Sequence, residues 1–557
     1  MGFYAKYCLT FHPILGIIIP RIGGATMSLV HLKNKNNGVT YVYESTGYWD
    51  KDKQQARNKR KCIGKLDPIT GNIIPSKKDT DSQISAQKQP GPIPTVECKR
   101  SFYGATYLFD AIGEKLGIID DLKSCFPESY KQILSIAYYL IMEDRNPMSR
   151  FPKWALTHTH PFGKDIPSQR SSELFGLINE DSKQKFFLLQ GKRRLEIEFL
   201  AYDTTSVSSY SQSLKQVKYG LNKDHDPLPQ INLALLFGEE SRLPVYYRKL
   251  AGNISDVKTI QNMLADINFL NLDKVKLVMD RGFYSEENIN AFYRNHYKFL
   301  IATKTSLKFV RTKVDEVRDS IASRPHYSSK YGLYYDSFMM DWNYSENKKR
   351  SGQTVQETKR MYLHIFYNDQ KATDVKIAFN KILDGLEEEL ISGKKISEHE
   401  KLYAKYFEIK TTPIRGISLI PKQEAIDEKA KYYGYFTLIS NGVKDPLDAL
   451  EIYRSKDMIE KAFGNLKERL NMRRTSVSSD ENLEGKLFVQ FVALIYLSYI
   501  KKMMSEKDLY KNYTMQELLD QFDVIERFEQ PGRRHRIGEM TNKQLNLYSY
   551  LGVDIPS

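Results

Sequence analysis

The sequence predicts an α/β protein in which helices cover a mixed β-sheet, with a mostly helical region before the sheet and an inserted module that interrupts it. Two observations predict this class. From residue 195 to residue 303, the apolar runs follow the order strand, strand, strand, helix, strand, helix, strand. Residues 98–190 instead repeat apolar side chains at helical spacing, and residues 305–435 follow neither pattern.

The first region, residues 1–95, is predicted to be basic and rich in short strands. Strand-like runs such as 40–43 alternate with Gly, Asn and Pro, and residues 89–95 (QPGPIPT) have the composition of a linker. Within residues 51–61 the basic side chains are Lys51, Lys53, Arg57, Lys59, Arg60 and Lys61. Asp52 is the only acid among them. Such a run suits an anionic partner, although charge runs are usually solvated surface.

Residues 96–190 are predicted to form a helical region and a candidate DNA-binding domain. Leu108, Ile112 and Leu116 recur at the spacing that places apolar side chains on one face of a helix. Residues 133, 136 and 140 repeat that spacing. No residue in this region suggests chemistry, and the region is one of several candidates for DNA contact.

Residues 191–304 are predicted to form the first part of the sheet. A strand alternates from residue 195 and turns fully apolar up to Asp203, as expected where its second half is buried. The further expected elements are strands at 230–237, 243–250, 275–279 and 297–303, and helices at 256–269 and 285–293. Three antiparallel strands followed by crossover units build a sheet of mixed direction with helices packed on it.

Residues 305–440 are predicted to be the inserted module. They hold aromatic strand-like runs at 331–340 and 361–367, a strongly charged helical pair at 370–407 and a further strand at 434–439. Residues 441–505 return to long helices as the second part of the core, and residues 506–557 form a basic, helical C-terminal tail. The apolar stretches 8–20 and 487–500 are too short to cross a bilayer, so no membrane segment is expected.

The composition indicates a globular protein with an anionic partner. Hydrophobic residues make up 41% and charged residues 27% of the chain, values that argue against disorder as the main state. The 83 Lys and Arg residues against 68 Asp and Glu leave a formal net charge of +15, and nucleic acid is the commonest large anionic partner. None of the four cysteines lies in a C-x-x-C pair, which fits a reducing cytoplasm better than a thiolate zinc site.

Two aspartates occupy equivalent places in the predicted sheet. Asp203 and Asp280 each end a short apolar strand and are followed by small or polar residues. On neighbouring strands, two such carboxylates would lie close enough to share a divalent cation, and without a metal their repulsion would be costly. The alternative is that each aspartate only starts a turn, as Asp often does at strand ends.

A third acid lies on a predicted helix. With a rotation of about 100° per residue, Tyr453, Lys456, Glu460 and Lys467 fall within a stripe about 60° wide. An apolar stripe runs beside it, so the helix would pack by one face and present Glu460 at the edge of the contact. Taken alone, this pattern also describes an amphipathic helix whose charges are simply solvated.

These residues resemble the signature of a known family. The spacing Y-x2-(R/K)-x3-E-x6-K over 453–467 is similar to that of DDE transposases of bacterial insertion sequences, in the insertion-sequence-four-like superfamily. The resemblance extends over residues 195–500 and includes DTT at 203–205, GNISD at 252–256, MDRGF at 279–283 and IEKAFGNLK at 459–467. The run NKRKCIGKLD at 58–67 resembles the longer-protein branch of that superfamily. Lys456 replaces the usual arginine, which keeps the charge but loses bidentate phosphate contact.

The resemblance implies an RNase H-like catalytic domain in which three carboxylates hold the metal. Asp203, Asp280 and Glu460 would bind two Mg²⁺ ions, with Mn²⁺ able to substitute. Phosphodiester transfer needs one metal to activate a water or 3′-hydroxyl and another to stabilise the leaving oxygen.

The resemblance also implies that side chains beside the carboxylates contact DNA. These side chains are Tyr453, Lys456, Lys467 and Arg281. Trp342, the only tryptophan of residues 305–435, is a candidate to stack on an unpaired or flipped base. The alternative for Trp342 is a place in the core or at the surface, which is more usual for an aromatic side chain.

The function expected from this resemblance is that of a transposase in the bacterial cytoplasm, at the nucleoid. It would bind the terminal inverted repeats of its own element as duplex DNA, cut there and join the ends to target DNA, as a homodimer on DNA. Two alternatives remain open from the residues alone. The first is a catalytically inactive DNA-binding protein of transposase descent, and the second is an RNase H-like nuclease that cuts without strand transfer.

Overall fold

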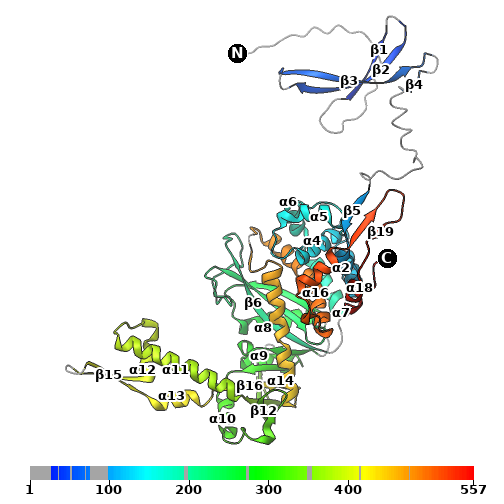
Figure 1. The fold of residues 1–557 in the computed structure, drawn as a ribbon. Helices are drawn as coiled ribbons and strands as arrows, with labels where there is room; N and C mark the ends of the chain where they lie inside the picture. The colour runs from blue at the N-terminus through cyan, green and yellow to red at the C-terminus, as the bar shows by residue number, and fades with distance from the viewer. Residues whose placement is uncertain are drawn as a thin grey trace. The chain divides into compact units, whose positions relative to one another are not determined.

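The computed structural model divides the chain into two compact units, Met1–Thr95 and Val96–Ser557 (Figure 1). It describes residues 27–34, 37–50, 53–68, 71–75, 98–193, 198–270, 272, 275–347, 354–412, 416–475 and 477–557. The apolar stretch 8–20 and the predicted linker 89–95 lie outside the described residues.

The first unit contains a four-stranded antiparallel sheet. Its strands, in the order β1-β2-β3-β4, are β1 (Met27–Lys33), β2 (Thr40–Asp50), β3 (Gln55–Leu66) and β4 (Ile73–Pro75). Strands β2 and β3 are much longer than their outer neighbours, and β4 pairs with β3 only over residues 64–66. The end of β2 and the start of β3 therefore extend beyond the four-stranded part.

The second unit begins with the helical region that the apolar spacing predicts. Its helices are α2 (Gly104–Lys115), α3 (Ile118–Cys125), α4 (Tyr130–Met142), α5 (Phe151–Thr157), α6 (Ser168–Leu177) and α7 (Glu180–Arg193). Helix α16 (Asp480–Glu506) contacts α4 and α6 as well as strand β8 (Pro244–Ala251), so it joins this helical layer to the sheet. Among the described residues, α16 alone is long and apolar enough to cross a membrane, and 89% of its apolar stretch is buried inside the protein.

A ten-stranded mixed sheet forms the centre of this unit. Its strands run in the order β11-β12-β13-β16-β10-β9-β6-β7-β8, and the short β17 (Arg474–Thr475) pairs with β6 off this path. The core strands are β6 (Phe199–Ser209), β7 (Gln230–Gly238), β9 (Lys276–Met279) and β10 (Lys298–Thr303), together with β8. Strands β6, β7 and β8 pair antiparallel, whereas β9 and β10 run parallel to β6. The predicted order of strands in the core is therefore observed.

Helices connect and cover these strands. Helix α8 (Asp256–Leu270) links β8 to β9, and α9 (Glu286–Arg294) links β9 to β10 through the 3-10 turn η3 (Arg281–Phe283). The Ser285 hydroxyl caps α9 by accepting from the backbone N–H of Asn288, close to the predicted start of this helix. The apolar side chains of β6, β9 and β10 belong to one continuous hydrophobic core with the helical region.

One strand is longer than predicted. The sequence indicates that Asp203 ends its strand, but β6 continues for six residues beyond it, to Ser209. Apart from Val207, residues 204–209 are small and polar, yet all are buried, because β7 pairs with them on one side and β17 at the far end. Asp203 is thus held within a strand that has neighbours on both sides, so its predicted place at a strand end is wrong.

The region predicted as an inserted module divides in two. Strands β11 (Tyr327–Ser328), β12 (Leu333–Asn347), β13 (Thr354–Tyr367) and β16 (Tyr435–Ser440) extend the central sheet beyond β10, after helix α10 (Lys308–Val317). The remaining elements are α11 (Asp369–Ile391), α12 (Glu400–Tyr406), β14 (Phe407–Thr412), β15 (Gly416–Pro421) and α13 (Gln423–Ala430), which enclose a small core of their own. Figure 1 shows this second part as an arm extending from the sheet.

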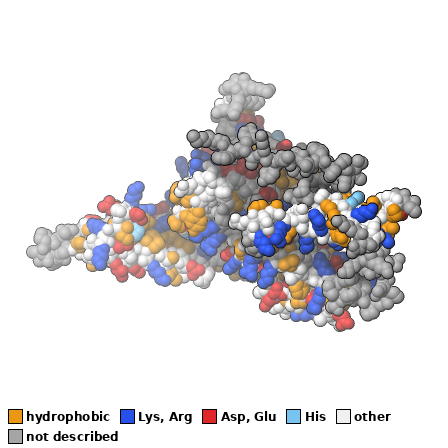
Figure 2. Space-filling model, turned by 90° about the horizontal axis from the view of Figure 1, so that it is seen from above, with side chains coloured by type: hydrophobic (Ala, Val, Ile, Leu, Met, Phe, Trp, Pro, Cys, Tyr) orange, Lys and Arg blue, Asp and Glu red, His pale blue; other side chains and the backbone are white. Residues whose placement is uncertain are grey.

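The arm (residues 369–430) carries eleven basic and twelve acidic residues. Figure 2 shows side chains of both signs interspersed along it. The positive charge of the chain is therefore not concentrated on the arm.

The helical segment after β16 is not one continuous α-helix. It consists of α14 (Pro446–Ser455), α15 (Asp457–Gly464) and a π-helical turn, η6 (Asn465–Arg469), and the break lies at Lys456. Helix α14 contacts β9, β10, β12 and β13, and α15 contacts β6. The prediction of one regular stripe from Tyr453 to Lys467 is wrong, because the α-helix is interrupted at Lys456 and its last turn is π-helical, while its two parts pack against different strands.

The C-terminal residues are only partly helical. Helices α17 (Met515–Asp523) and α18 (Asn542–Tyr550) flank two short strands, β18 (Glu526–Glu529) and β19 (Arg536–Ile537). Strand β18 pairs with β5 (Lys99–Phe102), at the start of the second unit. The C-terminal residues thus complete the helical region rather than forming a separate tail.

Candidate active site

Strand pairing brings Asp203 and Asp280 to neighbouring positions. Strands β6 and β9 are parallel, with Tyr202 opposite Met279, and the next residues along the two strands are Asp203 and Asp280. Asp280 follows the last residue of β9, and its Oδ1 accepts the backbone N–H of Arg281 at 2.7 Å. The Asp203 Oδ1 accepts the backbone N–H of Thr204 at 2.8 Å. Both carboxylates are therefore anchored by the backbone beside them.

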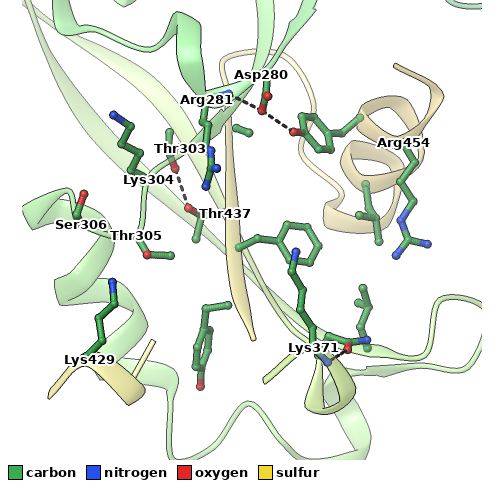
Figure 3. A pocket seen from close by; sticks show the side chains of 17 residues that line it. Asp280, Arg281, Thr303, Lys304, Thr305, Ser306, Lys371, Lys429, Thr437 and Arg454 are labelled. Atoms are coloured by element: carbon green, nitrogen blue, oxygen red, sulfur yellow. Dashed lines mark hydrogen bonds between the residues drawn. The ribbon is translucent and has the colours of Figure 1, made fainter. Parts of the chain in front are cut away.

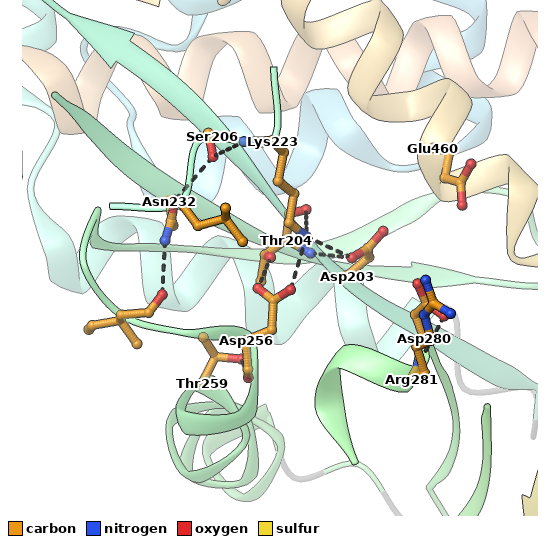
Figure 4. Close-up of polar contacts among 12 residues, drawn as sticks. Asp203, Thr204, Ser206, Lys223, Asn232, Asp256, Thr259, Asp280, Arg281 and Glu460 are labelled. Atoms are coloured by element: carbon orange, nitrogen blue, oxygen red, sulfur yellow. Dashed lines mark hydrogen bonds and ion pairs between the residues drawn. The ribbon is translucent and has the colours of Figure 1, made fainter. Parts of the chain in front are cut away.

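Helix α15 places Glu460 over this pair. Figure 4 shows Glu460 pointing from α15 toward the space beside Asp203 and Asp280. The Lys456 ammonium links the helix to the sheet, since its Nζ lies 3.0 Å from the Glu460 Oε1 and 3.9 Å from the Asp203 Oδ2. The structure therefore brings together the three acids that the sequence singles out.

Asp203 lies in a strongly polar but dehydrated environment. Its side chain is only 13% exposed, and burial raises its pKa above the ordinary value even though Lys223 and Lys456 lower it. The Lys223 Nζ lies 3.4 Å from the Asp203 Oδ1 and 3.2 Å from the Asp256 Oδ2, and it donates to the Thr204 carbonyl at 2.7 Å. Asp203 thus carries a buried charge that two cations compensate.

Lys456 is the more deeply buried of these two cations. Its side chain is 5% exposed, and burial acts to lower its pKa. The carboxylates of Asp203, Glu460 and Asp280 outweigh that effect, so the Lys456 pKa is raised. An ammonium group therefore lies where two of the three carboxylates meet.

The donor set fits a hard divalent cation. Three carboxylates supply only oxygen ligands, which Mg²⁺ and Mn²⁺ prefer, and Glu460 is 59% exposed, which leaves room for water or substrate oxygens. In the part of the chain that the structure describes, no three His, Cys, Asp or Glu side chains lie close enough together to hold a metal without moving. Lys456 has the flexible side chain needed to leave the space between Asp203 and Glu460.

Tyr453 and Lys467 make contacts that fully engage their polar groups. The Tyr453 hydroxyl donates to the Asp280 Oδ1 at 3.0 Å, and burial together with the Asp280 charge raises the Tyr453 pKa well above its usual range. The Lys467 Nζ lies 2.7 and 2.6 Å from the two carboxylate oxygens of Asp224. Tyr453 therefore orients Asp280, one of the three candidate acids. Lys467 instead pairs with Asp224 in the loop between β6 and β7 and contacts none of the three.

Arg281 lies at the mouth of a basic cavity of about 980 Å³ beside Asp280 (Figure 3). The cations that line this cavity are Arg281, Lys304, Lys371, Lys429 and Arg454. Asp280 is the only acid among its described lining residues. The cavity lies between the ends of β10 and β16, helix α14 and the base of the arm, and its charge suits a phosphate-bearing ligand.

Trp342 does not lie at this site. It is 8% exposed on β12, its Nε1 donates to the Asn290 side chain at 2.8 Å, and Phe309 packs edge-on against its ring. A ring enclosed in this way has no open face on which a base can stack. The structure thus favours the core position that the sequence leaves as the alternative.

Three further residues of the site were not predicted from the sequence, and two of them carry no signal in its pattern. Lys223 and Asp224 lie in the loop between β6 and β7, where neither periodicity nor a strand end marks them. Asp256 begins α8, which predicts a capping role, but its carboxylate also accepts from the Thr204 hydroxyl and pairs with Lys223. Only the GNISD motif at 252–256 singles out Asp256, and nothing singles out the two loop residues.

Comparisons with known proteins point to a family of transposases. A family model described as "Transposase DDE domain" matches residues 194–496, which are 303 of the 557 residues. Among solved structures, the cryo-EM structure of the piggyBac transposase synaptic complex with hairpin DNA is similar at a TM-score of 0.35 and 9% identity, covering 80% of this chain and 75% of that chain. A search of curated proteins found no match.

Proposed function

The chain belongs to the family of transposases with a DDE domain, and from this premise we propose that it moves an insertion sequence by a cut-and-paste reaction. In this proposal the protein binds the terminal inverted repeats of its element, cleaves phosphodiester bonds there and transfers the ends to target DNA. The observation that carries the proposal is the meeting of three acids from separate elements, with Asp203 next to Asp280 and Glu460 above them.

The catalytic core is proposed to be RNase H-like. Three antiparallel strands, β8, β7 and β6, are followed by β9 and β10 parallel to β6, with helices in the connections. This order supports the proposal because the carboxyl end of β9 then lies beside the middle of β6. The two strand-borne acids therefore come together on rigid backbone, which a metal-dependent reaction requires.

Asp203, Asp280 and Glu460 are proposed to hold two Mg²⁺ ions, or Mn²⁺ in their place. When bound, such ions activate the attacking oxygen and stabilise the charge on the leaving oxygen. The residues of the chain contribute orientation and charge. Tyr453 fixes the Asp280 carboxylate, and Lys223 keeps Asp203 ionised in its buried position.

Lys456 is proposed to move from the carboxylates to a DNA phosphate when the metals bind. The ammonium would then neutralise the phosphate next to the reacting bond, which is the role the signature implies for this position. Lys467 would reach a phosphate only by leaving Asp224, whereas Arg281 is exposed and needs no such release. The basic cavity at Arg281 supports a path for the DNA strand beside Asp280.

The reaction is proposed to take place on duplex DNA, in the bacterial cytoplasm at the nucleoid. Two ends must be joined to one target in concert, which favours a homodimer on DNA. The positive net charge of the chain supports binding through phosphates that weakens steeply with salt.

Three single substitutions test the proposal. Asp203→Asn, Asp280→Asn and Glu460→Gln should each abolish Mg²⁺-dependent cleavage of duplexes that carry the terminal repeat, while leaving repeat binding intact. Glu468→Gln is the matched control, because Glu468 is an exposed acid on the adjoining π-helical turn. Full cleavage by any of the three variants would overturn the assignment of the acids.

A second assay separates the proposed function from its alternatives. Wild-type protein is mixed with pre-cleaved ends and a target plasmid in Mg²⁺, and joined products are measured. Joining is expected. Cleavage without joining would identify a nuclease, and binding without cleavage would identify an inactive descendant.

A further inference from the structure

The N-terminal sheet ends in a two-stranded ribbon that no other described strand covers. Pairing between β1 and β2 stops at Met27 and Thr46, whereas β2 and β3 remain paired out to Asp50 and Gln55. Residues 47–50 and 55–58 therefore pair only with each other. Every residue from 55 to 61 is exposed, and so are Tyr48 and Trp49 on the opposite strand. Both faces of this ribbon are thus open to solvent.

One face of the ribbon carries a row of positive charge. Side chains alternate between the faces of a strand, so Arg57, Lys59 and Lys61 point to the same side at intervals of about 6.7 Å. Their partners across the pair are Tyr48, Thr46 and Glu44. The row is about 13 Å long, and two acids lie on the facing strand, Glu44 opposite Lys61 and Asp50 near Arg57.

The charges of the row differ in how far they lie from the rest of the sheet. Arg57 stands in the two-stranded part and forms a loose ion pair across the ribbon, with its Nε 3.5 Å from the Asp50 Oδ2. Lys59 and Lys61 stand where β1 adds a third strand. The two-stranded part that carries Arg57 is therefore thin enough to enter a groove. Lys59 and Lys61 lie on the wider, three-stranded part and would remain outside that groove.

We propose that this ribbon enters the major groove of the terminal-repeat duplex, where Arg57 contacts base edges while Lys59 and Lys61 hold the flanking phosphates. The inference rests on the proposed function, because it takes the terminal repeat as the DNA that is bound. The major groove is about 12 Å wide and admits a two-stranded ribbon, and arginine is the side chain that most often reads guanine there. Phosphate contacts on either side then fix the register.

The charge distribution favours DNA over a protein or lipid partner. Residues 27–75 contain nine basic and four acidic residues, whereas the arm is nearly neutral. Trp49 is 62% exposed on the other face of the ribbon, beside Ala56. A single exposed indole on a ribbon dominated by cations is too small an apolar patch for a protein interface.

Two variants of the full-length protein test the two roles separately. Binding to the terminal-repeat duplex and to a scrambled duplex is measured by fluorescence anisotropy over a range of salt concentrations. Lys59→Gln/Lys61→Gln should weaken binding to both duplexes alike and reduce the slope of log K against log salt by about 1.8. Arg57→Gln should lower the preference for the repeat over the scrambled duplex by about tenfold or more.

The matched control is Lys376→Gln/Lys381→Gln, which removes two exposed lysines from α11 of the arm and should leave the slope unchanged. Methylation of guanine N7 in the repeat should interfere with wild-type binding, because that atom lines the major groove. Unchanged affinity and slope in the lysine variant, or no interference by N7 methylation, would overturn the proposal.

Failure of this inference can be told apart from failure of the proposed function. Wild-type protein that binds and cleaves the repeat, together with ribbon variants that bind as wild type does, would refute only the ribbon. Wild-type protein that binds through the ribbon but neither cleaves nor joins DNA would refute only the catalytic proposal.

Discussion

Removing the Lys456 ammonium tests the electrostatic account of the site most directly. Lys456→Met leaves Asp203, which is 13% exposed, with Lys223 as its remaining cation at 3.4 Å. Breaking a buried ion pair by removing one partner costs about 3–5 kcal/mol. Glu460 is more than half exposed, so the loss of its ion pair with Lys456 costs little stability, and Lys223 compensates part of the Asp203 charge. We therefore expect a loss near the lower end of that range, about 3 kcal/mol.

The assay is urea unfolding in metal-free buffer, followed by tryptophan fluorescence. Trp154 and Trp342 are buried in the second unit and report on it, whereas Trp49 is exposed already. Lys461→Met is the control, since this exposed lysine pairs with Asp457 on the same helix and should change stability by less than about 0.5 kcal/mol.

Two further measurements make the reasoning refutable. Asp203→Asn/Lys456→Met should be more stable than Lys456→Met alone, because the double variant leaves no unpaired buried charge. At a hundredfold excess over its Kd, added Mg²⁺ should stabilise Lys456→Met by about 2.7 kcal/mol, and it should stabilise the wild type by less. Equal stability of Lys456→Met and wild type without metal would refute the idea that this ammonium compensates Asp203.

Three other changes have expected outcomes. Tyr453→Phe should slow cleavage by about 2- to 13-fold without changing DNA affinity, because one hydrogen bond that orients Asp280 is lost; single-turnover kinetics and anisotropy check this. Burial lowers the pKa of His160 to about 4, so on acidification the unfolded chain takes up the proton before the folded protein does. The free energy of unfolding should therefore fall as the pH drops from about 6.5 to about 4. His160→Gln should reduce this fall, as measured by urea midpoints across that pH range. Gly485→Ala should lower the thermal midpoint, because the added Cβ would clash with the Phe175 carbonyl, and this overpacking outweighs a helix-propensity gain of about 1 kcal/mol. Gly385→Ala should raise the thermal midpoint, because Gly385 lies on the arm helix α11 with open space around it.

The strand order of the core was predictable because it depends on local patterns. Alternating and fully apolar runs marked β6, β7, β8, β9 and β10, and Ser285 marked the start of α9. The three acids were singled out from the spacing of motifs, and the structure places two of them on neighbouring strands and the third on a helix beside those strands. Such patterns predict only the local conformation of the chain, within one helical turn or one strand.

The errors arose where distant segments meet. Strand β6 continues past Asp203 because β7 and β17, from residues far along the chain, pair with its polar half. The helix breaks at Lys456 because α14 and α15 pack against different strands. Trp342 is enclosed by residues of α9 and α10, which no local pattern relates to β12.

By itself, the sequence determined the order of the core strands and the resemblance to DDE transposases, and it singled out three acids as candidates. Only the tertiary structure decided how those acids are held. It places Lys223 and Lys456 against Asp203, Tyr453 against Asp280 and Lys467 against Asp224. The physical reason is that a buried charge must be compensated by whichever group reaches it in space, and that group is set by the packing of segments far apart in the chain.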